Sequence, residues 1–196
     1  MDKSAVLRYL NSMVNISPIK AQLILSKFNH FELKKGEMLL KEGQISRKSH
    51  LLVEGYIRSF VIDMAGNEVT TGIISTQHFA NDFSSYFKNE PAKENFQAIT
   101  DCTTYYISFD DMQFAFHNMP EFREFGRMML AMNYEHLHER MLSMIKDSAE
   151  VRYLNLLKKE PEMFQIVPLK IIASYLNITD SSLSRIRREI HQKRSP

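Results

Sequence analysis

The sequence predicts an α+β protein with an N-terminal antiparallel β-roll (jelly-roll-like) flanked by helices, a long dimerisation helix, and a C-terminal winged-helix-like helix-turn-helix. Five of the six glycines lie between residues 36 and 72, among short strand-like runs. Residues 127–160 contain neither glycine nor proline. Residues 168–190 carry apolar side chains at helical spacing on both sides of a polar break. We therefore place the three parts at 1–118, 119–147 and 148–196.

Composition limits the classes of protein that are possible. The 196 residues are 44% hydrophobic and 11% aromatic, which is enough for a packed core. The apolar runs are too short to span a membrane, and the N-terminus lacks the pattern of a signal peptide. Cys102 is the single cysteine, so neither an internal disulfide nor a cysteine cluster can form. We expect a cytoplasmic protein with no membrane partner.

The roll is predicted from short runs rich in β-branched and aromatic residues. Residues 56–63 partly alternate apolar and polar side chains, and Asp63–Asn67 has the composition of a hairpin turn. Before the roll, residues 6–14 follow a helical stripe, and Ser17 with Pro18 indicates the start of a second helix to residue 28. The expected strands are 37–41, 50–54, 56–63, 68–75, 95–100 and 103–109.

The long helix is predicted to begin at Pro120, after a lead-in capped by Ser108 and Asp111. Apolar residues then recur at steps of four and three, which is the seam of a coiled coil. A second stripe would face the body of the domain, so the seam is free to pair with a second copy; the alternative is a core helix within one domain. The seam is Leu130, Tyr134, Leu137, Met141 and Met144, and the second stripe is Phe122, Phe125, Met129 and Met132.

The last part has the layout of a helix-turn-helix. Pro168 opens an apolar helix that ends at Asn177, a residue that tolerates the left-handed conformation. Thr179 is a good N-cap for the next helix. That helix turns its apolar side chains inward, and its Ser and Arg side chains lie opposite. The inward residues are Leu183, Ile186 and Ile190.

The outer face of this second helix predicts binding to double-stranded DNA. From Glu150 onward the chain holds nine Lys and Arg against five Asp and Glu. Small serines let a helix enter a major groove, where Arg185 can pair with guanine and Arg188 with phosphate. The alternative is an amphipathic helical hairpin with a solvated basic face. The predicted DNA-binding residues are Thr179, Asp180, Ser181, Ser182, Arg185 and Arg188.

This order of parts resembles the Crp–Fnr family of bacterial transcription regulators. The resemblance rests on KGEMLLKEGQ (35–44), LVEGYIRSF (52–60) and IASYLNITDSSLSRIRREI (172–190), and the last segment is most similar to regulators of Bacteroidetes-type bacteria. It implies a cyclic-nucleotide-binding-like effector domain in the roll and a homodimer that reads a pseudo-palindromic DNA site. It also implies RNA polymerase as a partner and an effector that shifts the DNA-binding modules between two arrangements.

The segment from Phe79 to Cys102 departs from the cyclic-nucleotide-binding members. These carry Gly-Glu and then Arg-Ser/Thr, whereas this chain has Ala-Asn-Asp at 80–82 and Ala-Lys at 92–93. Without the arginine a buried phosphate would be poorly compensated. We therefore expect no cyclic AMP, no metal and no known cofactor, and leave open an unidentified small effector or a loss of effector control. The candidate pocket residues are Phe79, Asn81, Asp82, Lys93 and Asn95.

An enzyme and a protein-docking or ligand-sensing module are the two other classes of function. An enzyme is not expected, because the seven histidines form no metal-binding pattern and no nucleophile motif or phosphate loop is present, so no catalytic residue is predicted. The alternative that stays open is a dimeric module of cyclic-nucleotide-binding type that senses a ligand or docks proteins, without sequence-specific DNA binding.

Overall fold

The structure is a computed structural model that describes residues 3–194. It divides into two compact units, one running through Ser59 and resuming over Ile73–Glu135, the other formed by Phe60–Gly72 and the chain from His136 onward. The first unit contains the N-terminal helices and most of the roll, and the second contains the C-terminal helices together with the hairpin segment Phe60–Gly72. The functional division at 118 and 147, proposed from the sequence, stays a prediction.

Eight strands form the roll, in two four-stranded sheets with orders β1-β8-β3-β6 and β2-β7-β4-β5. The paired strands are antiparallel, with Leu51 opposite both Tyr105 on β8 and Phe79 on β6. The α+β class with an antiparallel roll is therefore confirmed. The strands are β1 (Asn29–Leu33), β2 (Met38–Leu40), β3 (Lys48–Glu54), β4 (Ile57–Ile62), β5 (Glu68–Ile74), β6 (Phe79–Ala80), β7 (Asn95–Ala98) and β8 (Cys102–Ser108).

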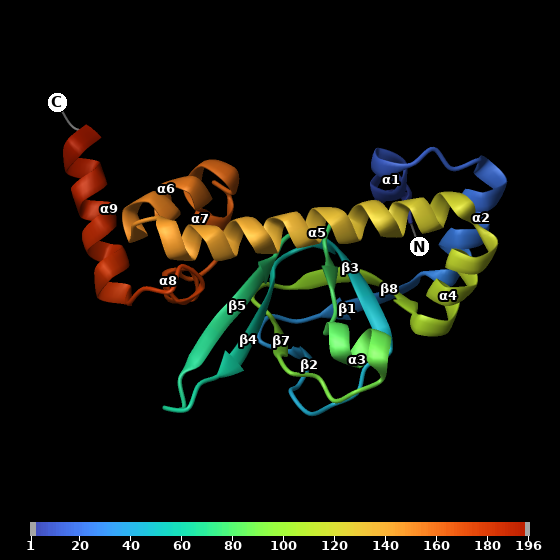
Figure 1. Cartoon of the computed structure of the whole chain (residues 1–196), viewed down its shortest axis with the longest axis horizontal. Coiled ribbons are helices and arrows are strands. Elements are labelled where there is room, and N and C mark those ends of the chain that lie inside the picture. Colours follow the sequence, from blue (N-terminus) through green and yellow to red (C-terminus); the bar gives the residue numbers. More distant parts are fainter. Residues whose placement is uncertain (1–2, 195–196) are drawn as a thin grey trace. The chain divides into compact units, whose positions relative to one another are not determined.

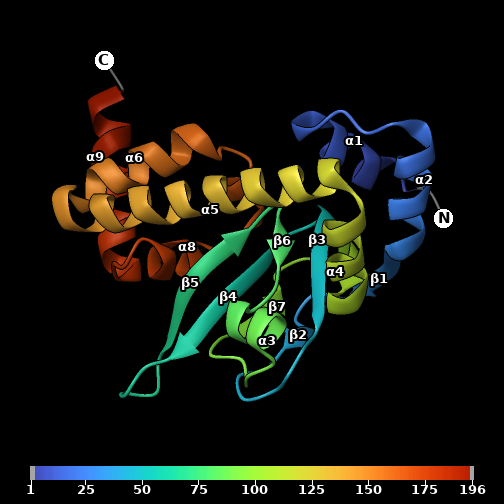
Figure 2. The ribbon, with the colours of Figure 1, turned by 45° about the vertical axis from the view of Figure 1, so that its right-hand side comes forward.

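The β4–β5 hairpin shows how local sequence sets the turns (Figure 2). Asp63 accepts the backbone N–H groups of Ala65 and Asn67, at 2.9 and 2.8 Å, and Gly66 adopts a φ of 84°. An aspartate that bonds the backbone two and four residues on, followed by glycine at positive φ, closes a tight turn. The predicted hairpin is confirmed.

Gly55 is required for a different reason. Its φ is 94°, and a Cβ atom there would lie 2.4 Å from the carbonyl oxygen of Asp101. The turn between β3 and β4 therefore packs directly on the chain that leads into β8, an approach that only glycine permits.

The N-terminal helices and the first half of the long helix share one core (Figure 1). Val6 and Ile24 are fully buried, as are Phe122 and Phe125 at the start of α5. Ser108 caps α4 as predicted, because its hydroxyl accepts the N–H of Asp111 at 3.1 Å. The helices of this region are α1 (Ser4–Met13), α2 (Pro18–Lys27), α3 (Phe83–Lys88), α4 (Phe109–Asn118) and α5 (Pro120–Lys146).

The interior of the roll is filled by a second cluster of apolar side chains. Leu52 and Ile57 are fully buried in it, beside Phe96 and Cys102. Burial raises the pKa of the Cys102 thiol, which donates to the carbonyl oxygen of Tyr56. A buried thiol of raised pKa is a packing residue rather than a reactive one.

The C-terminal helices are α6 (Ala149–Lys159), α7 (Met163–Ile166), α8 (Leu169–Tyr175) and α9 (Asp180–Arg194). The described residues 147–194 hold no strand. This segment therefore supplies helices and no β-strand wing, with α7 in the connection between α6 and α8. A search of residues 3–194 finds no helix long and apolar enough to span a membrane.

Candidate nucleic-acid interface

Helices α8 and α9 meet in the predicted helix-turn-helix. Asn177 adopts a left-handed φ of 55°, and the N–H of Ile178 donates back to the carbonyl of Ala173 at 3.0 Å. Thr179 then caps α9, since its hydroxyl accepts the N–H of Ser182 at 3.2 Å. A left-handed asparagine followed by a Thr cap stops one helix and starts the next within a few residues. The predicted turn is confirmed.

The two faces of α9 differ sharply. Leu183 and Ile186 are 1% and 6% exposed and form the inner face, with Ile190 half-buried. On the outer side, Arg185 and Arg188 are exposed. The remaining predicted DNA contacts lie at the start of the helix: Thr179, Asp180 and Ser181 are exposed, and Ser182 is half-buried. The structure thus places all six predicted residues along one end and the outer face of α9.

Guanidinium groups carry the positive charge of this face, and Arg185 has a weak partner within the helix. Arg185 Nε lies 4.0 Å from Glu189 Oε1, and both side chains are largely exposed. An exposed pair at this distance contributes little to stability. The Arg185 guanidinium therefore exchanges this contact for a stronger acceptor at small free-energy cost.

A polar groove of about 460 Å³ lies between α6 and α9. Arg187 and Arg188 line it on α9, together with His191, and Tyr153 and Leu157 line it on α6. Arg188 is the residue that the sequence assigned to phosphate contacts, and Arg187 is its neighbour in this groove. The groove extends the cationic surface beyond the outer face of α9.

The predicted dimer seam is a row of exposed apolar side chains on α5. Tyr134 is 71% exposed, Leu137 62%, Met141 52% and Leu130 46%, and Met144 is half-buried. On the second stripe, Phe122, Phe125 and Met129 pack into the core as predicted. Met132 is exposed instead, so its placement on the body-facing stripe was wrong: the stripe extends past the buried part of the helix.

The candidate effector pocket is organised by a buried carboxylate. Asp82 is 6% exposed, and its two oxygens accept the N–H groups of Ser85 and Lys93, at 2.8 and 2.9 Å. It caps α3 in this way. A negative group already holds these backbone donors, and the buried Ala92 stands beside them in place of a cation. This arrangement disfavours a second, phosphate anion at the same place.

The other predicted pocket residues are dispersed around the roll. Phe79 packs against the core that contains Tyr9, and Asn81 donates to Ser49 Oγ at 3.0 Å. Lys93 is exposed, and Asn95 accepts the N–H of Glu42 at 3.1 Å. Nearby aromatic residues are dispersed in the same way: Phe79 and Tyr86 lie in one cluster, Phe96 in the other, and Phe83 is 57% exposed.

No metal site is found among residues 3–194, which contain no group of three or more His, Cys, Asp or Glu that could hold a metal ion. His78 is exposed and contacts the carbonyl of Thr76 through Nδ1. His50 is buried, and its Nδ1 lies 3.1 Å from Thr104 Oγ1; burial, with Lys48 nearby, lowers its pKa to about 4.

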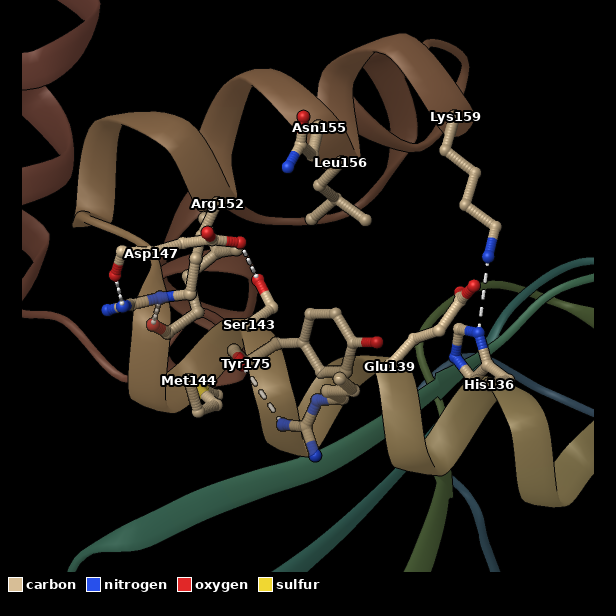
Figure 3. Close-up of a pocket in the computed structure, with 12 residues that line it drawn as sticks. His136, Glu139, Ser143, Met144, Asp147, Arg152, Asn155, Leu156, Lys159 and Tyr175 are labelled. Carbon is tan, nitrogen blue, oxygen red and sulfur yellow. Dashed lines mark hydrogen bonds between the residues drawn. The ribbon is translucent and has the colours of Figure 1, made fainter.

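Sequence reasoning missed a groove of about 330 Å³ between α5, α6 and α8 (Figure 3). Arg140 on α5 and Arg152 on α6 line it, with Tyr175 of α8 as an aromatic wall. Each arginine donates to a main-chain carbonyl at the end of α8. No sequence signal marked these arginines, because side-chain spacing does not reveal a main-chain acceptor.

Comparison with known families and solved structures agrees with this fold. Residues 30–118 match the family model of the cyclic nucleotide-binding domain. No curated protein matches by sequence. FixK2 from Bradyrhizobium japonicum has a TM-score of 0.72 at 17% identity, with 85% of each chain covered. The c-di-GMP responsive global regulator CLP of Xanthomonas campestris has a TM-score of 0.67 at 12% identity, covering 98% of this chain and 93% of that chain.

A third structure, assigned to the Crp–Fnr family of transcriptional regulators and from Eubacterium rectale, has a TM-score of 0.68 at 13% identity. It covers 91% of this chain and 85% of that chain. At such identities the likeness establishes the fold alone. The resemblance predicted from the sequence is therefore confirmed for the fold, whereas the narrower likeness to Bacteroidetes-type regulators stays a prediction.

Proposed function

We propose that this protein is a homodimeric, DNA-binding transcriptional regulator, because residues 30–118 match the family model of the cyclic nucleotide-binding domain and the chain has the fold of Crp–Fnr regulators. The observation that carries the proposal is the exposed outer face of α9. It combines Arg185 and Arg188 with small hydroxyl side chains, on a helix anchored by Leu183 and Ile186.

Recognition would proceed through two kinds of contact. Arg185 projects from the middle of the outer face, where a guanidinium can donate two hydrogen bonds to the O6 and N7 of a guanine. Thr179 and Ser181 at the start of α9 supply hydroxyls for phosphate or base edges. Arg188 and Arg187 extend the cationic surface and would bind phosphates, which position the helix without specifying sequence.

Dimerisation would supply the symmetry of the site. The exposed seam residues Leu137 and Met141 give α5 an apolar row that a second copy of the helix can cover. Two α9 helices related by a two-fold axis then read two half-sites about one helical turn apart. A pseudo-palindromic operator follows from this symmetry.

The segment of the roll that would bind the phosphate of cyclic AMP lacks the arginine of the cyclic-nucleotide-binding members. Asp82 accepts the N–H of Ser85 in α3 and the N–H of Lys93 beyond it, and an arginine for a cyclic phosphate is missing from residues 92–93. We therefore propose that cyclic AMP does not regulate the protein. If the protein is such a regulator, we propose that it acts in the cytoplasm and that RNA polymerase is one of its partners.

The test is selection of genomic DNA fragments by the purified, ligand-free protein near physiological salt. Enrichment of a two-fold-symmetric sequence is expected, with affinity that falls on added salt by a slope of about 0.9 per neutralised phosphate. A protein that enriches no sequence, with or without cell-extract metabolites, would contradict the proposal and favour a ligand-sensing or protein-docking module.

A further inference from the structure

Two arginines of the second unit hydrogen-bond consecutive carbonyls at the end of α8 (Figure 3). Arg140 Nη2 donates to Tyr175 O at 3.1 Å, and its guanidinium lies over the Tyr175 ring, 4.4 Å from the ring centroid. Arg152 Nε donates to Leu176 O at 3.2 Å, and its Nη1 donates to Asp147 O at 2.7 Å. One side chain comes from α5 and the other from α6.

These contacts complete the hydrogen bonding of the end of α8. The preceding carbonyls of Ala173 and Ser174 accept the N–H groups of Ile178 and Asn177. The carbonyls of Tyr175 and Leu176 come last and accept from the two arginines. The final carbonyls of a helix lack partners within it and carry partial negative charge, so guanidinium groups bind there favourably.

Arg152 also joins the ends of two helices. Asp147 directly follows α5, and Leu176 directly follows α8, so one planar guanidinium connects both. A planar fork of donors holds two acceptors in a fixed relation, which a flexible ammonium group does less well.

The position of these contacts links dimerisation to DNA reading. Arg140 lies on α5 between the seam residues Leu137 and Met141, which are exposed one turn apart. On the other side, α9 begins at Asp180, four residues after Leu176. The two guanidinium groups therefore contact the segment that joins α8 to the recognition helix, next to the seam.

We propose that Arg140 and Arg152 are positioning residues, which hold the helix-turn-helix in the orientation that lets two copies fit successive major grooves. This inference rests on the proposed function. Without the clamp, formed by Arg140 and Arg152, the helix-turn-helix samples several orientations. Only the fraction of the protein in the fitting orientation can bind both half-sites. The apparent Kd for the full site then rises in inverse proportion to this fitting fraction. Binding to a single half-site does not depend on that orientation.

The experiment compares Arg140→Ala and Arg152→Ala with wild type on two duplexes of equal length. One carries the selected two-half-site sequence, and the other carries a single half-site. Lys146→Ala is the matched control, because it removes a positive charge from the last turn of α5, where Lys146 is exposed. If the fitting fraction falls to about one tenth, the Kd for the full site rises about tenfold, while the half-site Kd changes less than about twofold.

Equal weakening on both duplexes, or an effect no larger than that of Lys146→Ala, would overturn the positioning role. Thermal unfolding of each variant checks that the fold is retained. If Arg152→Ala does not fold, Arg152→Lys replaces it. Arg152→Lys is expected to remain stable while still losing the preference for the full site. A wild type without preference for the full site would instead contradict the proposed function itself.

Discussion

Arg185 and Glu189 face each other across one turn of α9, with Nε and Oε1 4.0 Å apart. Because the pair is exposed and weak, Arg185 is available to DNA. Replacing Arg185 with Ala is expected to cost about 1–3 kcal/mol of binding and to relax preference at one base position. The measurement is affinity for the selected site and for single-base variants of it.

The control for this substitution is Arg188→Ala, which should weaken all sequences alike and reduce the salt slope by about 0.9. If Arg185→Ala behaves in the same way as Arg188→Ala, Arg185 contacts phosphate and its assignment to a base is wrong.

The seam on α5 makes a second prediction. Leu137 is 62% exposed, and burying a carboxylate in its place within a dimer would be unfavourable. Leu137→Asp is therefore expected to sediment as a monomer and to lose full-site binding. Met132→Asp is the matched control, since Met132 is also exposed but lies on another face of α5. A Leu137→Asp protein that remains dimeric would place the interface elsewhere.

Glycine substitutions test the close approach at the β3–β4 turn. A Cβ at position 55 would meet Asp101 O at 2.4 Å and Thr100 Oγ1 at 2.6 Å, and the residue has a positive φ. Gly66 has a similar φ with no atom within 4 Å. Gly66→Ala should cost about 1–2 kcal/mol from backbone strain alone, and Gly55→Ala clearly more. Urea unfolding measures both, and equal losses would show that the turn relaxes freely.

Buried His50 predicts a pH dependence of stability. Its folded-state pKa is lowered from 6.5 to about 4 by burial and by Lys48, with the uncharged Thr104, Phe31 and Tyr106 around it. The unfolded chain therefore binds a proton first as pH falls. The free energy of unfolding is therefore highest above pH 6.5, and it falls by about 3 kcal/mol as the pH drops from 6.5 to about 4.

The measurement is the difference in free energy of unfolding between wild type and His50→Gln at several pH values. This difference is expected to shrink as the pH falls from about 7 to 4. His78→Gln, which replaces an exposed histidine, is the comparison variant. Parallel curves for His50→Gln would show that His50 titrates normally.

Cyclic AMP is expected to leave the Tm of the protein unchanged. A ligand that binds the folded state at 100 times its Kd adds about 2.7 kcal/mol of stability, which thermal unfolding readily detects. The carboxylate of Asp82 and the buried Ala92 give the phosphate no counter-charge. A rise in Tm that saturates with cyclic AMP concentration would contradict this prediction.

Several elements could be read from local sequence alone. The β4–β5 turn depends on Asp63 and Gly66, the start of α4 on Ser108 and Asp111, and the turn before α9 on Asn177 and Thr179. In each case the side chain bonds a backbone group a few residues away, or sets its own φ. Such contacts are local, so residue order suffices to predict them.

Strands β1 and β6 were missed because their own sequences favour neither strand nor helix. These segments form strands because β8 and β3 supply hydrogen-bonding partners. The stripe on α5 was extended one residue too far, to Met132, because periodicity does not show where the covering core ends.

By itself the sequence determined the order of parts, the helix-turn-helix and the seam, since periodicity and capping are properties of neighbouring residues. Tertiary structure alone decided that Asp82, besides capping α3, also accepts the N–H of Lys93, that His50 is buried, and that Arg140 and Arg152 bind the end of α8. Each of these depends on a backbone group or a desolvated environment beyond the neighbouring turn of the chain. Side-chain spacing carries no record of such partners.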